Sequence, residues 1–216
     1  MFALRPDGFA GDVSHAALAL LEAHGPQGVT MRRLAQAVGV PVASLYRYVA
    51  GKADILDRVL DLVFAGIPDP PEAPGYWTRA LEERLRSFRG ALERHPGAVT
   101  LLGGRPLVTP AALRFLDQVA GILRRGGLRE LDVGFAARAA VGVVAGLSLL
   151  DAGERAGDAA AGPGAVAQHM RSLPGREYPH LAAAWERPGA PADAGFDAAL
   201  RIWLAGVAGG IPRPPD

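Results

Sequence analysis

A cluster of cationic side chains with no carboxylate among them is the feature of this sequence best suited to specific chemistry. Between Thr30 and Ala53 the chain has no Asp or Glu, and its basic residues there are Arg32, Arg33, Arg47 and Lys52. Guanidinium and ammonium groups bind phosphate oxygens, and arginine also pairs with the edge of guanine. Because the formal net charge of the whole chain is only +1, any attraction to nucleic acid must come from this local cluster.

Two short helices joined by a tight turn are predicted to carry the cluster. Thr30 is a good N-cap for a helix over 31–38, and Gly39 ends that helix. A second helix is expected over 42–48. Longer helices precede and follow the pair, over residues 12–24 and 52–65. This arrangement is a helix-turn-helix, whose second helix enters the major groove of DNA.

The pattern of the short helices separates a small core from an outward face. Leu34, Val38 and Leu45 are predicted to fill the core. The side chains left to face outward are Ser44, Tyr46, Arg47 and Tyr48. The residues that flank this face and can reach phosphates are Thr30, Arg32 and Lys52. The alternative is an ordinary helical hairpin with a solvated basic face.

The remainder of the chain is also predicted to be helical. Apolar stripes with helical spacing run over 77–92 and 110–123, and Pro96-Gly97 is expected to end the first of them. The stretch 152–175 has few large apolar residues and is expected to be a loop with one short helix at about 165–171. No run alternates long enough for a strand. The predicted fold class is all-α, with an N-terminal three-helix helix-turn-helix domain and a larger α-helical domain.

Two late segments, 134–150 and 196–208, are apolar almost all round. A helix without a polar face must be covered on all sides. In a chain of 216 residues this indicates that a partner subunit covers one face, and we expect a homodimer.

Composition excludes several classes of protein. The absence of cysteine excludes disulfides, thiolate metal sites and a cysteine nucleophile. The five histidines have no metal-ligand spacing, and no catalytic motif or phosphate-binding loop is found. We therefore expect no enzyme activity, no metal and no cofactor. Residues 1–15 lack a signal peptide's apolar core, and the longest uncharged run, 34–46, is too short to span a membrane. These features predict a cytoplasmic protein that does not associate with membranes.

The run 28–56, and above all its ending Leu45-Tyr46-x-x-Val49-x-x-Lys52, closely resembles the N-terminal domain of the TetR family of bacterial transcriptional regulators. The segments that resemble the regulatory domain of the tetracycline repressor branch are 77–92, Gly103-Gly104-Arg105-Pro106 and Leu116-Asp117-Gln118. This resemblance implies a regulatory core in which the two late apolar helices form a four-helix bundle with the partner subunit.

The resemblance also implies which residues contact a double-stranded DNA operator. The family positions that contact DNA are occupied by Arg32, Ser44, Tyr46, Tyr48 and Lys52. The positions where operator sequence is read are occupied by Val42, Ala43 and Arg47. Because a twofold dimer reads two half-sites, the operator is expected to be a pseudo-palindrome.

The family's ligand cavity maps onto a further set of residues. The matching positions are Phe88, Arg105, Pro106 and Gln118. Two positions depart from the tetracycline branch: Leu101 replaces the histidine that ligates the drug-bound magnesium, and Arg84 replaces a polar amide. Ile67 or Pro68 stands where a second histidine is expected. We therefore expect a small organic effector other than magnesium–tetracycline, apolar or weakly polar, with any anionic group bound by Arg84 or Arg105.

Other roles for these side chains stay open from the sequence. Phe88 and Leu101 could be plain core, and Arg105 could cap a helix or pair with an acid. Gln118 could face solvent, and Arg84 borders an apolar stripe from which it could reach water.

The predicted organisation is a helix-turn-helix DNA-binding domain with its connecting helix over residues 9–66, and a ligand-binding and dimerisation domain over 67–211. The predicted function is a homodimeric transcriptional repressor that a small organic ligand releases from a palindromic operator. One alternative is a constitutive DNA-binding dimer without ligand control. The other, an α-helical enzyme using the same cavity, would need a titratable pair or a metal there.

Overall fold

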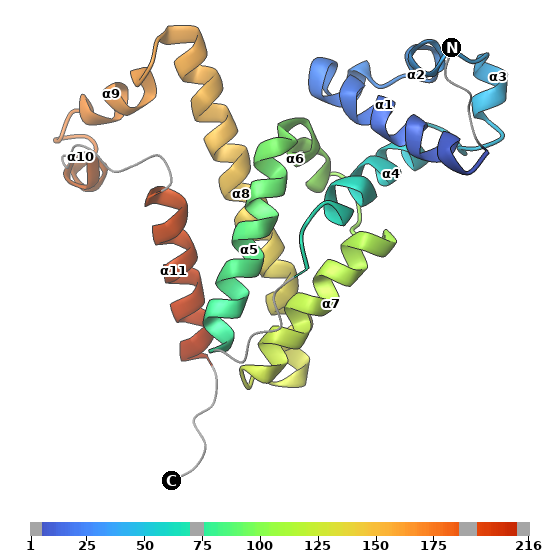
Figure 1. Cartoon of the computed structure of the whole chain (residues 1–216). Coiled ribbons are helices and arrows are strands. Elements are labelled where there is room, and N and C mark those ends of the chain that lie inside the picture. Colours follow the sequence, from blue (N-terminus) through green and yellow to red (C-terminus); the bar gives the residue numbers. More distant parts are fainter. Residues whose placement is uncertain (1–5, 70–75, 186–193, 211–216) are drawn as a thin grey trace.

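The computed structural model of the chain describes residues 6–69, 76–185 and 194–210, and every regular element within these ranges is a helix (Figure 1). The all-α prediction is confirmed. The N-terminal helices are α1 Pro6–Gly28, α2 Met31–Val38, α3 Val42–Leu45 and α4 Lys52–Ala65. The helices that follow are α5 Trp77–Arg94, α6 Pro96–Leu102, α7 Pro110–Arg125, α8 Glu130–Ala161, α9 Ala165–Arg171, α10 Pro179–Trp185 and α11 Ala194–Gly209.

Local capping signals set the bounds of α2, as the sequence predicts. The Thr30 hydroxyl accepts a hydrogen bond from the backbone N–H of Arg33 at 3.3 Å, which satisfies one of the free donors at the helix start. Gly39 ends the helix in the left-handed region, at φ 73°, where a side chain would be strained. Leu34 and Leu45 are fully buried between the helices, as expected.

The second short helix is shorter than predicted. Helix α3 ends at Leu45, and residues 46–48 form a turn instead of completing the helix to Tyr48. The backbone N–H groups of Tyr48 and Val49 both donate to the Leu45 carbonyl, at 2.9 and 3.0 Å. This turn buries Val49 and directs the chain into α4.

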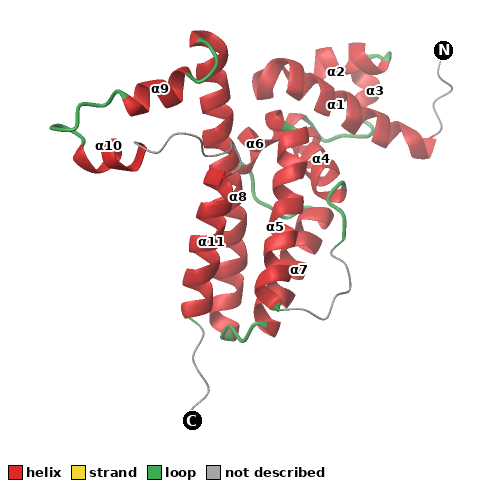
Figure 2. Ribbon diagram, turned by 60° about the vertical axis from the view of Figure 1, so that its left-hand side comes forward, coloured by secondary structure: helices red, strands yellow, loops and turns green. Residues whose placement is uncertain are grey.

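The buried side chains of the N-terminal helices and of the rest of the chain belong to one continuous core. Helix α4 runs between the two parts, because it packs against α1 on one side and against α6 and α7 on the other. Figure 2 shows α5, α7, α8 and α11 as a bundle of long helices beside this junction. Helix α4 therefore joins the N-terminal helices to the bundle, together with α1, which packs directly against α6.

One expectation for the second half is wrong. Residues 152–161 are not a loop, because α8 continues to Ala161; the segment is rich in alanine and contains no proline before Pro163. The short helix expected at 165–171 is confirmed as α9.

Pro96-Gly97 does more than end a helix, since Pro96 occupies the first turn of α6, where its missing N–H costs no hydrogen bond. The sequence did not predict α10.

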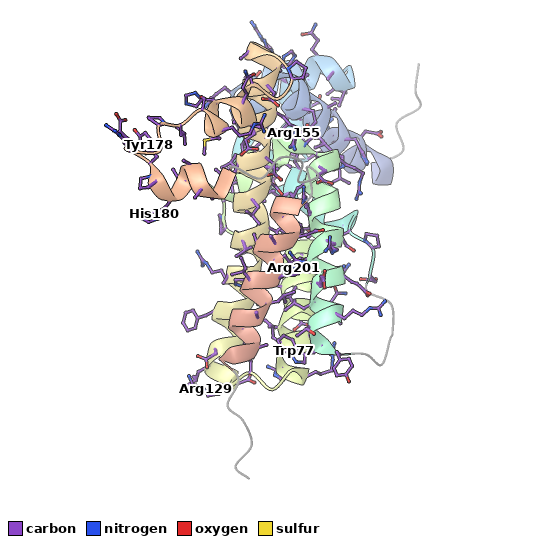
Figure 3. The ribbon with its side chains drawn as sticks, turned by 90° about the vertical axis from the view of Figure 1, so that its left-hand side faces the viewer. Trp77, Arg129, Arg155, Tyr178, His180 and Arg201 are labelled. Carbon is purple, nitrogen blue, oxygen red and sulfur yellow. The ribbon has the colours of Figure 1, made fainter. Side chains whose placement is uncertain are left out.

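Helices α9 and α10 form an arm that extends from the far end of α8 (Figure 1). They pack against each other, and α9 contacts the end of α8. Tyr178 and His180 project from this arm away from the bundle (Figure 3).

One face of α8 is buried and another is bare. Ala140 and Val144 are fully buried within the bundle. On the opposite side Leu131 and Phe135 are 83% and 79% exposed, and Ile202 on the neighbouring α11 is 74% exposed. Among the described helices, α8 alone is long and apolar enough to cross a membrane, but it packs against α5, α6 and α7 as a bundle helix.

Candidate nucleic-acid interface and cavity

The side chains expected to contact DNA come from α2 and its N-cap, from α3 and the turn after it, and from the first residue of α4; we call this set the α3 surface. Tyr46 is 57% exposed, Tyr48 38% and Val42 36%. Its other exposed members are Thr30, Arg32, Ala43 and Arg47, and its half-buried members are Ser44 and Lys52. None of the nine is buried. All the residues that the sequence assigned to this role are therefore accessible to a second molecule.

The α3 surface is rich in unpaired cations. Within the described part of the chain, Arg32, Arg47 and Lys52 form no ion pair with a carboxylate. Arg33 differs, because its guanidinium turns back toward the Gly28 carbonyl at 3.5 Å. Cations that lack an internal partner are free to bind phosphate oxygens or base edges.

Helix α4 fixes the turn that carries Tyr46, Arg47 and Tyr48. Arg58 donates from Nη2 to the Tyr48 carbonyl at 2.8 Å and from Nε to Asp54 Oδ1 at 3.0 Å. Asp54 Oδ2 accepts the backbone N–H of Ala50 at 2.9 Å. Partial burial would by itself raise the pKa of Asp54, but the hydrogen bonds from Arg58 and Ala50, with the charge of Arg58, outweigh burial and hold that pKa below its ordinary value. The α3 surface is thus attached to the first half of α4.

The side of α4 that carries Asp57 and Asp61 is attached to the loop between α6 and α7. Arg105 donates from Nε to Asp57 Oδ1 and from Nη2 to the Ala53 carbonyl, both at 2.7 Å. One turn further along α4, Asp61 Oδ1 accepts the backbone N–H of Ala111 at 2.7 Å, which caps the start of α7. One helix therefore connects the α3 surface with the α6–α7 loop.

A cavity of about 940 Å³ lies between the α6–α7 loop, α7 and α8. Its walls are mainly aliphatic, with contributions from Val99, Leu102, Leu107, Leu116 and Val141. Three charged residues line it: Arg105, Asp117 and Arg138. This size and this mixture of apolar walls with few charged groups are typical of sites for small organic molecules.

Only two of the six residues expected to bind a ligand line this cavity, namely Arg105 and Pro106. Phe88 is fully buried and stacks on Phe64 and Phe115, with ring centroids 5.2 and 5.0 Å apart. Leu101 is only 5% exposed and belongs to the same core. These aromatic rings fill the space beside Phe88, so Phe88 and Leu101 are core residues in this structure.

Arg84 and Gln118 do not line the cavity either, because they bind each other. The Arg84 guanidinium donates to Gln118 Oε1 and to the Pro68 carbonyl, and it lies 4.5 Å from the centre of the Phe115 ring. Gln118 in turn donates to Asp69 Oδ1 at 2.8 Å. Burial lowers the pKa of the Arg84 guanidinium, and the charge of Asp69 opposes that effect. This network joins the segment after α4 to α5 and α7, and Arg84 does not line the cavity in this structure.

Sequence reasoning missed cavity residues on α6, on the α6–α7 loop, on α7 and on α8, and those on α8 had a visible signal. Gly134, Arg138 and Gly142 line the cavity, whereas the sequence pattern assigned the whole of 134–150 to helix packing. The signal available was the repetition of glycine along one side of the helix, which leaves room beside the backbone.

Within the described residues, no group of three His, Asp or Glu side chains is placed to share a metal ion. Where the tetracycline branch has a magnesium-ligating histidine, the side chain present is the buried Leu101. The residues at this position therefore do not fit the metal-chelating half of that site.

Two family models match the chain. Residues 14–59 match the model described as bacterial regulatory proteins, tetR family, and residues 67–210 match the tetracyclin repressor-like C-terminal domain. The second match alone covers more than half of the chain.

Known relatives agree with these matches over most of the chain. An HTH-type transcriptional regulator of Saccharopolyspora erythraea is 33% identical over 193 residues, which is 89% of this chain and 81% of the relative. The class A tetracycline repressor from transposon 1721 in Escherichia coli is 33% identical over 215 residues, 93% of this chain and 89% of the relative. The solved structure of ActR from Streptomyces coelicolor in complex with actinorhodin superposes with a TM-score of 0.79 at 27% identity, covering 99% of both chains.

These proteins are regulators, and the prediction that the chain is not an enzyme is confirmed. On the family matches, the relatives and the helix-turn-helix with its bundle domain, this chain belongs to the TetR family of DNA-binding transcriptional regulators.

Proposed function

We propose that the chain acts in the cytoplasm as a homodimeric repressor that a small organic ligand releases from a palindromic operator. The observation that carries this proposal is that α4 is bonded both to the α3 surface and to a residue in the wall of the cavity. A ligand that changes the position of the α6–α7 loop would therefore change the position of the α3 surface.

The bare faces of α8 and α11 support the homodimer. An apolar groove of about 530 Å³ runs between the two helices and includes Leu147, Leu150, Ile202 and Trp203 in its walls. Leu150 is 66% and Ile202 74% exposed in the single chain. Large exposed apolar patches mark interaction surfaces, and a second copy of the same helices covers this one in a twofold dimer.

In this proposal the residues of the α3 surface have two roles. Arg47 reads a base edge, with Val42 and Ala43 placed to contact a thymine methyl. The residues that bind the phosphate backbone are Thr30, Arg32, Ser44, Tyr46, Tyr48 and Lys52. The division into a DNA-binding part, 9–66, and a ligand-binding and dimerisation part, 67–211, belongs to the same proposal, with α4 as the connection.

The cavity supports ligand control. Its aliphatic walls and its size suit an organic molecule, and the similar ActR chain has been solved in complex with actinorhodin. The alternative of a constitutive DNA-binding dimer would need no such cavity.

The test begins with selection of bound sequences from a random duplex library. The proposal expects a pseudo-palindromic consensus and a complex of two chains per duplex in sedimentation. Phe135→Arg or Ile202→Arg is expected to yield monomers that bind this duplex weakly. Arg155→Ala, at an exposed position of the same helix as Phe135, is expected to leave the dimer intact. A screen of organic compounds by fluorescence anisotropy then follows release from the duplex. A monomeric chain, or a dimer that no compound releases, would contradict the dimer or the ligand-control part respectively.

A further inference from the structure

Arg105 belongs to both halves of the proposed switch. It lines the cavity, yet two of its guanidinium nitrogens are bonded to α4 through Asp57 and the Ala53 carbonyl. The side chain of Arg105 is 18% exposed and that of Asp57 36% exposed. The Asp57 carboxylate can therefore regain hydration if its partner leaves, whereas Arg105 stays at the wall of the cavity.

The charges around the cavity favour an anionic ligand. Arg105 and Arg138 line it against a single carboxylate, Asp117. Arg84, the other arginine that the sequence offered, is bonded to Gln118 and the Pro68 carbonyl. An anionic group of a ligand would thus meet Arg138 or Arg105, and of these two Arg105 is the one bonded to α4.

The wall contributed by α8 favours a flat ligand. Gly134, Gly142 and Gly146 line the cavity without side chains, and a Cβ added at any of the three would have no heavy atom within 4 Å. Aromatic rings can lie against such an exposed backbone more closely than against branched side chains. The aliphatic side chains of α6 and α7 supply the opposite wall.

Resting on the proposal that this cavity binds the effector, we propose that the effector is an anionic aromatic molecule that takes the Arg105 guanidinium from Asp57. A carboxylate or sulfonate of the ligand replaces the Asp57 carboxylate as the partner of Arg105. No covalent bond changes in this exchange. It breaks the link at Ala53 and Asp57, while the bond between Asp61 and Ala111 keeps the second half of α4 on α7. The freed end of α4 is the end that carries the α3 surface through Asp54 and Arg58.

The test uses two probes that share their rings and differ in charge. The anionic probe is 8-anilinonaphthalene-1-sulfonate, and the uncharged one is N-phenyl-1-naphthylamine. Asp57→Asn removes the internal competitor for Arg105. It therefore raises the affinity for the anionic probe by about two- to fivefold and leaves the affinity for the uncharged probe unchanged. Arg105→Gln lowers the affinity for the anionic probe by about tenfold or more and again leaves the affinity for the uncharged probe unchanged.

Asp61→Asn is the matched control, because it removes a carboxylate one turn along the same helix that does not contact Arg105. It leaves the ratio of the two affinities at the wild-type value, and thermal melting checks that each variant is folded. If Asp57→Asn changes both probes equally, or neither, the exchange at Arg105 is wrong although the cavity still binds ligands. If the wild-type chain binds neither probe, the cavity is not a ligand site and the proposed ligand control fails with it.

Discussion

The arginines of the α3 surface and those of the bundle have opposite surroundings. Arg32 and Arg47 are exposed and, in the described part of the chain, meet no carboxylate. Arg84 is 4% exposed and is held by a carbonyl, an amide and an aromatic ring. Because a guanidinium is charged in both settings, the difference lies in where its hydrogen-bond partners come from. The partners of the bundle arginine are internal, and those of the surface arginines come from water or from a second molecule.

Arg105 lies between these two cases. It has internal partners on α4, but it also lines a cavity that a second molecule can enter. An arginine can therefore stabilise the fold, recognise a ligand or do both, according to where its hydrogen-bond partners come from.

The largest effect is expected at the buried arginine, Arg84. Arg84→Ala leaves Gln118 and the Pro68 carbonyl without their donor and lowers the free energy of unfolding by about 3 kcal/mol. Arg86→Ala on the same helix removes ion pairs with Glu82 and Asp197 that solvent reaches, and it costs less than about 1 kcal/mol. Urea denaturation of both variants measures the two values, and equal losses would remove the distinction between the arginines.

A smaller effect, visible only in DNA binding, is expected at Arg47. Arg47→Ala reduces discrimination at one base pair of each half-site by about 1–3 kcal/mol, without a change in the melting temperature. Competition between the selected duplex and single-base variants measures this loss. An unchanged preference would mean that Arg47 does not face the base edges.

Lys52 is expected to bind the phosphate backbone rather than a base. Lys52→Ala is expected to weaken all duplexes alike and to lower the slope of log affinity against log salt by about 1, because an ammonium group on a phosphate carries no sequence information. Titrations at several salt concentrations, on the selected and on an unrelated duplex, provide the measurement. A loss confined to the selected duplex would contradict the phosphate role.

The smallest effect concerns the link beneath the α3 surface. The pKa of Asp54 is lowered in the folded chain, so its contribution to stability is present above the unfolded value of about 3.9 and is lost as the pH falls through the lower folded value. The free energy of unfolding of the wild-type protein is expected to exceed that of Asp54→Asn by less than about 1 kcal/mol at pH 7. This difference in stability shrinks as the solution is acidified. A gap that widens in acid would contradict the lowered pKa.

The sequence was most informative where structure is decided locally. The bounds of α2 follow from Thr30 and Gly39, which act within one helical turn, and those of α4 were also predicted as observed. The exposed α3 surface followed from the same pattern. The continuation of α8 through 152–161 was missed because few large apolar residues were taken as a sign of a loop, although alanine needs no packing to remain helical.

The ligand residues were harder to predict because their partners are distant in the sequence. Arg84 meets Gln118, 34 residues away, and Arg105 meets Asp57, 48 residues away. Nothing in the local pattern distinguishes an arginine held by such a partner from one that faces a cavity. Of the possibilities left open for Arg105, pairing with an acid is the one observed, and the same residue also lines the cavity.

Hydrogen exchange on the chain with and without its selected duplex tests directly whether the α3 surface binds DNA. The α3 surface is expected to be the contact, so DNA slows exchange in peptides that cover residues 31–51 and leaves those of the α9–α10 arm unchanged. Protection of the α9–α10 arm or of α5, with residues 31–51 unaffected, would contradict DNA binding by the α3 surface.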